Sequence, residues 1–389
     1  MGIDKPFIDK PFIDDLSVCR KQKSARRPAA RRADLSSAAH CARSRNSGGW
    51  PLWRLVVRRD MTAEIPRGPK LSRTRCLWSC LRLVLVALGF ASAISSLAWA
   101  QAETAKSPAL RQGKHFDRVL LIVLENQNYS AAMKDKFLAD LARKGTSFSN
   151  FKNLYHPSYP NYLAMIAGSS FGVRNDSQKD FPDDREHRTI ADLLDWSNYA
   201  EDYPAKPNDV KPFLSDEQGK YARKHVPFLS FKKIQSESFR NVVSVDSKNP
   251  NNAFVTDIQN FRKDPKKYPL PRYMFYSPNL DDDGHDPSSN PPKGLQQASN
   301  WLKNFFQTWF PLDLMKGTLV VVTFDESEHD EQPDRIYTVF LGDMVKVQEI
   351  KDEYNHYSVL RTIEDNFGLK PIHSESGDGT AEPVRDVWK

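Results

Sequence analysis

A serine stands between two prolines in the segment HPSYPNY, residues 156–162. Ser158 is a candidate nucleophile, but a serine hydroxyl is a poor nucleophile at its free pKa and needs a base or a metal ion to activate it. The prolines allow a simpler interpretation, a rigid turn in which Pro157 and Pro160 restrict the backbone around the serine. The choice between the two depends on which other side chains fold next to Ser158.

Polar pairs follow two strongly apolar segments. VLLIVL precedes Glu125 and Asn126, and TLVVVTF precedes Asp325 and Glu326. Such runs are typical of strands buried on both faces, and ligands bind at the carboxyl ends of strands in open α/β sheets. One carboxylate after a strand is most often a helix cap or a turn residue. Two pairs of oxygen ligands indicate a site for a divalent cation, whose identity the sequence does not give.

Two histidines are placed to join this site. His285 lies in the acidic loop NLDDDGHD after a short aromatic segment, where the aspartates would raise its pKa or help it to bind metal. His356 precedes an amphipathic helix and can face the same side of the sheet. The acidic loop also resembles a calcium loop, but Asn290 replaces the final glutamate and Pro287 interrupts it, so we exclude an EF-hand. His225, in KHVPF, is ambiguous.

Apolar segments and helical patterns alternate along the chain. The expected strands lie within 119–126, 273–286, 318–326 and 336–343, and the expected helices are 130–145, 189–199 and 295–310. This alternation favours an α/β sheet with helices on both faces. Residues 200–270 have weak periodicity and many Pro, Lys and Asp residues, so we expect a loop-rich insertion over the sheet.

The basic charge of the chain belongs to its first hundred residues. They hold 19 of the 56 Lys+Arg and 7 of the 49 Asp+Glu, a net charge of +12, which leaves −5 for the rest. Because the rest contains no basic stripe with interleaved aromatic residues, we expect no nucleic-acid partner.

An apolar run after Arg82 ends in AWA at Ala100, which is typical of a signal peptide cleaved there. The run is short for a membrane span of about 20 residues, so we expect a periplasmic or secreted protein with no stable span after cleavage; an uncleaved anchor is the alternative. All four cysteines precede Ala100, so any metal in the mature chain must be held by O and N ligands. With translation starting at Met61, the expected divisions are a non-native or disordered extension over 1–60, a signal peptide over 61–100, a linker over 101–115 and a catalytic domain over 116–389.

Six motifs occur in a fixed order: ENQNY, HPSYPNYLAMIAGS, KHVPF, SPNLDDDGHD, TFDES and NHYSVLRTIEDNFGL. Together they resemble the phosphoesterase family that contains bacterial acid phosphatases and phospholipases C, within the alkaline phosphatase-like superfamily. The resemblance covers nearly all of residues 116–370. It implies a three-layer α/β/α sandwich with a mostly parallel central sheet.

The resemblance also implies a role for each matched residue. Ser158 would be the nucleophile as well as a metal ligand, and His285 and His356 would line the phosphate site and transfer protons. The divalent metal would be held by Glu125, Asn126, Ser158, Asp325 and Glu326. An asparagine after the nucleophile would hold phosphate oxygens, a place that either Asn161 or Asn175 could fill, and His225 matches a further family histidine in the substrate site.

We expect an exported, metal-dependent enzyme that hydrolyses phosphomonoesters through a phosphoserine. We favour monoesters over diesters because the chain stops soon after the helix that follows His356. Phospholipase C members often have further C-terminal domains. A diesterase that acts on a phospholipid headgroup is the first alternative, and an inactive exported binding protein is the second. Sulfatases of the superfamily carry a Cys/Ser-x-Pro-x-Arg signature, and here Tyr162 replaces the arginine, which disfavours sulfate esters.

Overall fold

The computed structural model describes residues 112–389 except 207, 286–293 and 329–332. All of these residues belong to the second of two compact units, Gly89–Lys389. The expected extension, the signal peptide and most of the linker therefore lie outside the described residues. Within the described part, no helix is long and apolar enough to cross a membrane.

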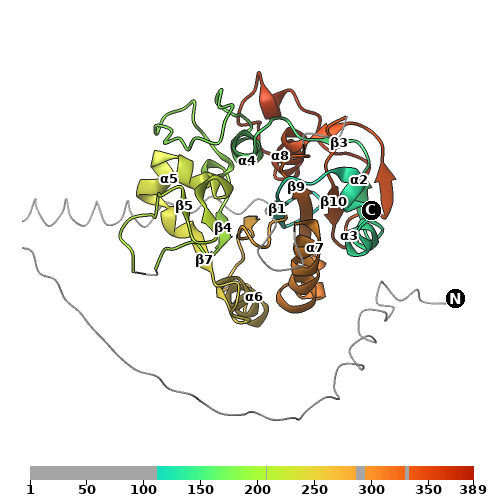
Figure 1. The fold of residues 1–389 in the computed structure, drawn as a ribbon, viewed down its shortest axis with the longest axis horizontal. Coiled ribbons are helices and arrows are strands. Elements are labelled where there is room, and N and C mark those ends of the chain that lie inside the picture. The colour runs from blue at the N-terminus through green and yellow to red at the C-terminus, as the bar shows by residue number, and fades with distance from the viewer. Residues whose placement is uncertain (1–111, 207, 286–293, 329–332) are drawn as a thin grey trace, which may run out of the picture. The chain divides into compact units, whose positions relative to one another are not determined.

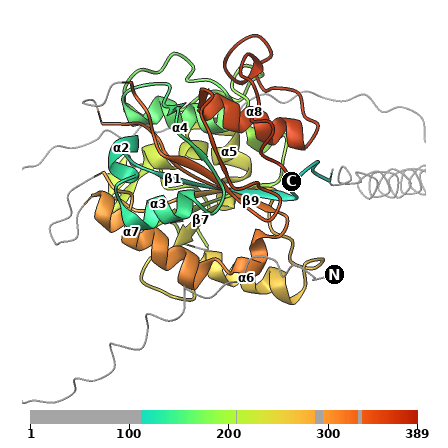
Figure 2. The ribbon, with the colours of Figure 1, turned by 90° about the vertical axis from the view of Figure 1, so that its right-hand side faces the viewer.

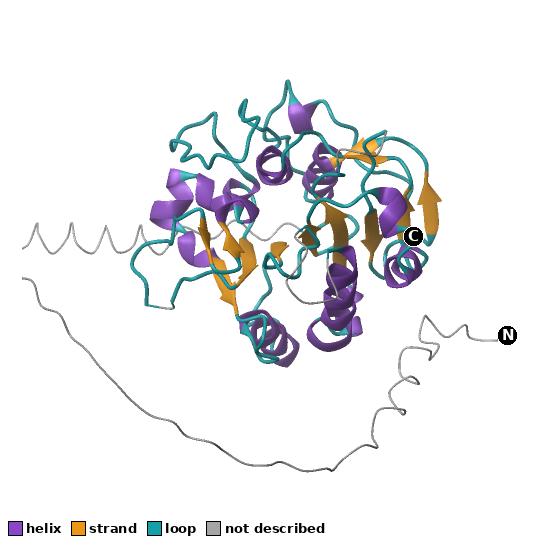
Figure 3. Cartoon of the chain, in the orientation of Figure 1, coloured by secondary structure: helices purple, strands orange, loops and turns teal. Residues whose placement is uncertain are grey.

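An eight-stranded sheet forms the centre of the described domain (Figure 3). Its order is β11-β2-β10-β9-β1-β8-β4-β7, and the five neighbouring strands from β9 to β7 run parallel, whereas β10 is antiparallel to both of its neighbours. The strands are β1 (Arg118–Leu124), β2 (Thr146–Phe148), β4 (Trp196–Glu201), β7 (Val242–Val245), β8 (Tyr273–Ser277), β9 (Thr318–Phe324), β10 (Thr338–Leu341) and β11 (Gln348–Ile350). Two short ladders pair β3 (Phe151–Lys152) with β12 (Tyr354–Asn355) and β5 (Glu217–Gln218) with β6 (Tyr221–Ala222).

Helices cover both faces of the sheet, as Figure 2 shows. One face carries α4 (Ser158–Ala167), α5 (Lys232–Glu237) and α8 (His356–Asn366), and the other carries α3 (Lys136–Ala142), α6 (Ala253–Lys263) and α7 (Leu295–Asn304). The central strands β8 and β9 are buried along their whole length, as expected for parallel strands covered on both sides. The fold is therefore the expected three-layer α/β/α sandwich (Figure 1).

The remaining helical segments are short. The helix expected over 130–145 is divided into α2 (Tyr129–Ala132) and α3, and the one expected over 295–310 is α7 followed by a π-helical segment, Phe305–Trp309. The single-turn 3-10 helices are η2 (Ile190–Asp192), η3 (Arg223–His225), η4 (Pro227–Ser230), η5 (Phe239–Asn241), η7 (Leu312–Met315) and η8 (Gly377–Gly379).

The helix expected over 189–199 is wrong. Thr189 and Asp192 do form a capping box, but the helix that they start ends after the three residues of η2. The following residues form β4, which pairs with β8 on one side and β7 on the other, so sheet pairing overrides the local helical pattern. The stretch 200–270, expected to be a loop-rich insertion, also supplies β7 and α6 to the main sandwich.

Two buried acids join α8 to the C-terminal segment. Glu364 Oε1 accepts a hydrogen bond from the Ile372 N–H at 3.0 Å, and the Asp378 carboxylate accepts from the N–H groups of Ile372 at 2.7 Å and His373 at 3.2 Å. Burial, together with the charge of Asp378, raises the pKa of Glu364 to about 9. Glu364 is therefore protonated at neutral pH and shares its proton with Asp378.

Replacing Glu364 with glutamine tests this shared proton. A carboxyl group whose pKa rises on folding stabilises the fold fully below its unfolded pKa of 4.5, and this contribution is lost as the pH rises through about 9. We expect the wild type to lose on the order of a few kcal/mol relative to Glu364→Gln across this range, since one pKa unit is worth about 1.4 kcal/mol. Urea unfolding at a series of pH values measures the difference.

The matched control for this series is Asp365→Asn. Asp365 is the next residue along α8, and its side chain is about half exposed and paired with Lys114. We expect its effect on unfolding to stay small at every pH, because an exposed ion pair contributes little. If Glu364→Gln also differs from the wild type by the same amount in acid and in alkali, the shared proton is refuted.

Candidate active site

The pairing of two parallel strands brings the two polar pairs together. β1 and β9 pair residue for residue, with Leu124 opposite Phe324 at their carboxyl ends. The Asp325 N–H donates to the Leu124 carbonyl at 2.9 Å, and the Asn126 N–H donates to Asp325 Oδ1 at 3.0 Å. Asn126 has a positive φ of 42°, a backbone conformation that asparagine tolerates better than most residues. Glu125–Asn126 and Asp325–Glu326 therefore form one polar cluster at the edge of the sheet.

Ser158 reaches this cluster from the start of a helix. It is the first residue of α4, with Pro157 before it, and its side chain is buried. Ser158 Oγ lies 3.1 Å from Glu125 Oε2, 3.1 Å from Glu326 Oε1 and 3.4 Å from Asn126 Oδ1. A hydroxyl has one proton to donate and cannot satisfy three acceptor oxygens. The surplus of acceptors matches the oxygen-rich environment that a divalent cation prefers.

The surroundings shift the pKa values of the three acids, Glu125, Asp325 and Glu326, in different directions. Burial, with the charges of Glu125 and Glu326, raises the pKa of Asp325 well above its usual range. Burial and the charge of Glu125 likewise raise the pKa of Glu326 to about 7. Burial alone would raise the pKa of Glu125 as well, but the charge of His225 and a hydrogen bond from it, with a smaller effect of Lys224, lower it to about 2.

These acids do not yet form a closed metal cage. Among the described residues, no three His, Cys, Asp or Glu side chains converge as a ready metal site. The buried Asp325 Oδ2 accepts no hydrogen bond from the described part of the chain. A cation that approaches such an oxygen would relieve the repulsion between the acids, and the oxygens of Asn126 and Ser158 would complete its ligands. The donor types therefore fit a divalent metal.

His225, the last residue of η3, contacts the Glu125 carboxylate. Its Nε2 lies 3.2 Å from Glu125 Oε1 and its Nδ1 lies 3.7 Å from Asp283 Oδ2. The imidazole is stacked on the Tyr162 ring, with ring centroids 5.1 Å apart. His225 thus lies at the Glu125 carboxylate, and its expected contact with phosphate stays a prediction.

The other two expected histidines occupy different environments. His356 is the first residue of α8, buried, with Nε2 2.7 Å from the Asp325 carbonyl oxygen, so Nε2 carries the proton. Burial lowers the pKa of His356 to about 4, so its ring is neutral above this pH. His285 is exposed in the loop whose Asp283 carbonyl accepts from the Glu125 N–H at 2.9 Å. His356 therefore contacts and orients the end of β9, whereas His285 lies at the surface in its loop.

The two expected phosphate-binding asparagines do not share one environment. Asn161 is buried, and its Oδ1 accepts from the N–H groups of Leu154 at 3.1 Å and Tyr155 at 3.0 Å while its Nδ2 donates to the Tyr155 carbonyl at 2.8 Å. Asn161 thus fixes the loop that leads to the nucleophile. Asn175 is exposed and its Oδ1 accepts from the Ser177 N–H at 3.1 Å. A role for either in binding phosphate stays a prediction.

Three side chains near the nucleophile were missed by the sequence analysis. His156 Nδ1 contacts Glu326 Oε2, and His156 lies two residues before Ser158 in the segment first considered, which was the available signal. Lys224 precedes His225 in the same motif and forms an ion pair with Asp176, Nζ to Oδ2, at 3.0 Å. Nothing in the sequence around Asp176 indicates this position.

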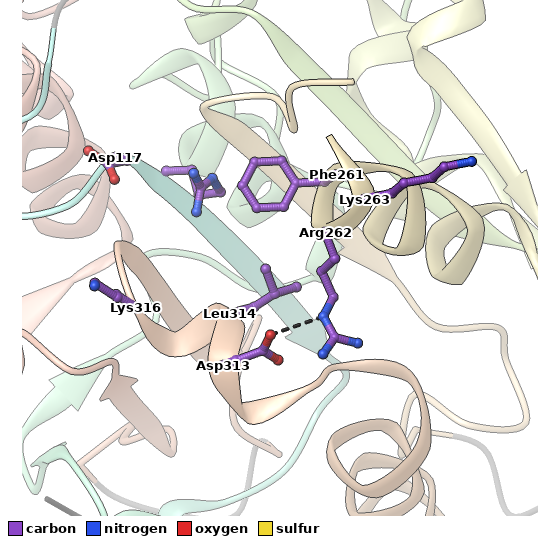
Figure 4. A pocket seen from close by; sticks show the side chains of 8 residues that line it. Asp117, Phe261, Arg262, Lys263, Asp313, Leu314 and Lys316 are labelled. Atoms are coloured by element: carbon purple, nitrogen blue, oxygen red, sulfur yellow. Dashed lines mark hydrogen bonds and ion pairs between the residues drawn. The ribbon is translucent and has the colours of Figure 1, made fainter. Parts of the chain in front are cut away.

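A cavity of about 610 Å³ lies elsewhere and does not coincide with the cluster. Figure 4 shows Arg262 paired with Asp313, Nε to Oδ2, at 3.0 Å on its wall. Arg118, the first residue of β1, also lines it, and Phe261 lies beneath that guanidinium at 4.7 Å. The cavity is therefore at the amino end of β1, opposite the end that carries Glu125, and it is not the active site.

Comparison with known proteins identifies the family. The sequence profile of the Phosphoesterase family matches residues 99–370, which include both polar pairs and Ser158. The chain belongs to the phosphoesterase family.

Named relatives share about a third of the aligned residues. A probable acid phosphatase of Kluyveromyces lactis is 33% identical over 69% of this chain and 62% of its own length. A phosphatidylinositol-3-phosphatase of Mycobacterium tuberculosis is 31% identical over 70% of this chain and 83% of its own length. The chain thus spans less than two thirds of the first of these relatives. A solved structure from Vibrio parahaemolyticus, described as a protein in the alkaline phosphatase superfamily, is 14% identical over 72% of this chain and 73% of its own, with a TM-score of 0.47, too distant to support an argument.

His225→Phe tests whether the imidazole is needed to hold Glu125 in the metal-free protein. Phenylalanine keeps a ring to stack on Tyr162 but removes the nitrogen that faces Glu125, so the buried carboxylate loses the partner that lowers its pKa most. We expect a loss of about 3 kcal/mol in the free energy of unfolding, measured with urea in the presence of a chelator.

His187→Phe is the control. His187 Nδ1 contacts the exposed Asp184 and its ring stacks on Phe181, so the same substitution removes a contact with a carboxylate outside the cluster. We expect a clearly smaller loss for it, because a contact with an exposed carboxylate contributes little to stability. Equal losses in the two variants would show that the Glu125–His225 contact has no special importance.

Proposed function

We propose that this chain hydrolyses phosphomonoesters with Ser158 as the nucleophile. The observation that carries the proposal is the buried Ser158 Oγ at the start of α4, 3.1 Å from both Glu125 and Glu326. Membership of the phosphoesterase family supports the reaction class.

In the proposed reaction, Ser158 Oγ attacks phosphorus while the bond from phosphorus to the ester oxygen breaks. The serine proton passes to a water molecule, and the departing alcohol takes up a proton from a histidine. Water then attacks the phosphoserine, which returns the serine and releases inorganic phosphate. The amino end of α4 supports each step, because the positive end of a helix dipole stabilises negative charge that develops beside it.

A divalent metal fits the same cluster. We propose that it is held by Glu125, Asn126, Ser158, Asp325 and Glu326, whose oxygens are already gathered at the ends of β1 and β9. Such an ion favours the serine alkoxide and neutralises charge on phosphate oxygens. His225 and His356 position the ligands, the first at the Glu125 carboxylate and the second at the Asp325 carbonyl.

We assign protonation of the leaving alcohol to His285 rather than to His356. His285 is exposed beside the loop that contacts Glu125, so its imidazole can face a departing group. His356 is buried, and its Nε2 proton is already donated to Asp325. A group that protonates a leaving alcohol needs access to it at hydrogen-bond distance.

The substrate class that we propose is the phosphomonoester, attached either to a small alcohol or to a lipid headgroup. The probable acid phosphatase of K. lactis and the phosphatidylinositol-3-phosphatase of M. tuberculosis support this class by their names. A side-by-side assay with p-nitrophenyl phosphate and bis-p-nitrophenyl phosphate distinguishes it from the phospholipase C type of diesterase. We also propose that the protein is exported after cleavage at Ala100, which N-terminal sequencing of the mature protein would test.

Ser158→Ala removes the proposed nucleophile. We expect turnover of p-nitrophenyl phosphate to fall by at least about 10³-fold, because no other group takes over covalent catalysis. We also expect acid quenching followed by mass spectrometry to find phosphate on the Ser158 peptide of the wild type only. Ser177→Ala, on an exposed loop, is the control and keeps wild-type turnover.

Two outcomes of this experiment oppose the proposal in different ways. If Ser158→Ala turns over esters as fast as the wild type, the nucleophile is another residue. If the metal-supplied wild type hydrolyses no ester at all, the chain is better described as a binding protein.

Asp325→Asn tests the proposed metal ligands. We expect a chelator to abolish activity of the wild type and added divalent metal to restore it. In Asp325→Asn, we expect metal affinity measured by calorimetry to fall at least about 10-fold, since a neutral amide replaces a buried carboxylate. Asp343→Asn serves as control. The Asp343 carboxylate accepts a hydrogen bond from the Gly317 N–H, just before the amino end of β9, whereas Asp325 follows the carboxyl end of that strand. Unchanged metal content in Asp325→Asn would rule out this ligand set.

A further inference from the structure

A lysine that neither the sequence analysis nor the proposed reaction uses stands beside the nucleophile. Lys224 is the middle residue of η3, between two fixed neighbours. The Arg223 guanidinium donates to the Leu229 carbonyl at 2.9 Å and pairs with Asp180, and the buried His225 faces Glu125. The backbone of Lys224 is therefore fixed on both sides, and its side chain starts from a rigid position.

Contacts link the ammonium group of Lys224 to the first turn of α4. Lys224 Nζ lies 3.0 Å from Asp176 Oδ2, and Asp176 Oδ1 accepts the N–H of Tyr159 at 3.0 Å. Tyr159 is the residue after Ser158. One carboxylate, that of Asp176, thus links the ammonium to the backbone N–H that follows the nucleophile, and the ammonium also lies within the electrostatic influence of Glu125 and Asp325.

The surroundings of Lys224 keep it charged. Burial would lower the pKa of Lys224, but the charges of Glu125, Asp176 and Asp325 raise it above its ordinary value. The lysine side chain is 19% exposed, against 39% for its partner Asp176, so the ammonium is shielded from water but still accessible. A shielded charge acts more strongly on a neighbouring anion than an exposed one.

The hydrogen-bonding capacity of Lys224 exceeds what the described residues use. An ammonium group has three donors, and Asp176 is the hydrogen-bond partner that the described part of the chain gives it. Lysine binds phosphate oxygens as a compact point charge. Donors remain for an anion bound in front of Ser158.

We propose that Lys224 contacts the non-bridging oxygens of the bound phosphate and makes the site prefer monoesters to diesters. This inference rests on the proposed function. A phosphomonoester carries about −1.5 to −2 charge at neutral pH, whereas a diester has one ionisable oxygen fewer and a single charge. A fixed cation beside the nucleophile therefore stabilises the bound monoester more than the bound diester.

The competing explanation is that Lys224 only holds Asp176 in place to cap α4. Asp176→Asn separates the two explanations, because an amide oxygen can still accept the Tyr159 N–H while the ion pair with Lys224 is lost. If the lysine is only structural, Lys224→Met and Asp176→Asn should have similar effects on both ester types. If it binds phosphate, only Lys224→Met removes the preference.

The experiment compares kcat/KM for p-nitrophenyl phosphate and for bis-p-nitrophenyl phosphate in the metal-loaded full chain. We expect Lys224→Met to lower the monoester-to-diester ratio by about 10- to 100-fold, the range for a hydrogen bond to a charged group. Lys224→Arg should keep most of the ratio, and Asp176→Asn should keep or increase it. An unchanged ratio in Lys224→Met, or an equal fall in Asp176→Asn, would overturn the proposal.

A binding measurement separates failure of this inference from failure of the proposed function. Inorganic phosphate is titrated calorimetrically into Ser158→Ala and into Ser158→Ala/Lys224→Met. We expect the second protein to bind phosphate about 10- to 100-fold more weakly. If the wild type hydrolyses neither ester but this difference is found, the reaction is wrong and the lysine site stands. If both variants bind phosphate equally, or neither binds it, Lys224 is not a phosphate ligand.

Discussion

The site depends on the register between β1 and β9, two parallel strands from opposite ends of the domain sequence. Side chains of a strand alternate between its two faces, so a slip of one residue would turn every side chain to the opposite face. Glu125 and Glu326 would then no longer approach Ser158 together. The uniform apolar character of both strands drives their burial but does not define their register. Contacts at the ends do so, including the bond from the Asn126 N–H to the Asp325 carboxylate.

The helices bring their first residues to the same edge of the sheet. α4 begins with Ser158 and α8 begins with His356, and both lie on the same face in Figure 2. A side chain fixes each start: Asp176 accepts the second N–H of α4, and Asn355 caps α8. The site is therefore made of two strand ends and two helix starts. Loops contribute residues to it, but the rigid elements determine its geometry.

The amino-acid sequence predicts the parts of this arrangement that follow from local pattern. Long apolar runs predicted β1 and β9 and placed a polar pair after each, and the structure brings both pairs to Ser158. Local pattern failed where long-range pairing decides, as in β4, whose strand residues were expected to continue a helix. It also failed for contacts made between loops. The ion pair of Lys224 with Asp176 joins residues 48 positions apart, and no periodicity predicts it.

Two groups of buried acids among the described residues differ in how their burial is balanced, and the difference shows why one of them is the candidate active site. Glu364 and Asp378 share a proton, backbone N–H groups donate to both, and the Arg361 guanidinium lies 3.5 Å from Glu364 Oε2, so this pair has a cation and hydrogen-bond donors within the fold. Asp325 is also buried, but Oδ2 accepts no hydrogen bond from the described residues, and its neighbours are further acids. A fold selected for stability alone would replace such a group, since an unsatisfied buried carboxylate destabilises the folded state. Its position, next to a serine at a helix start, is where a bound cation would supply the missing charge.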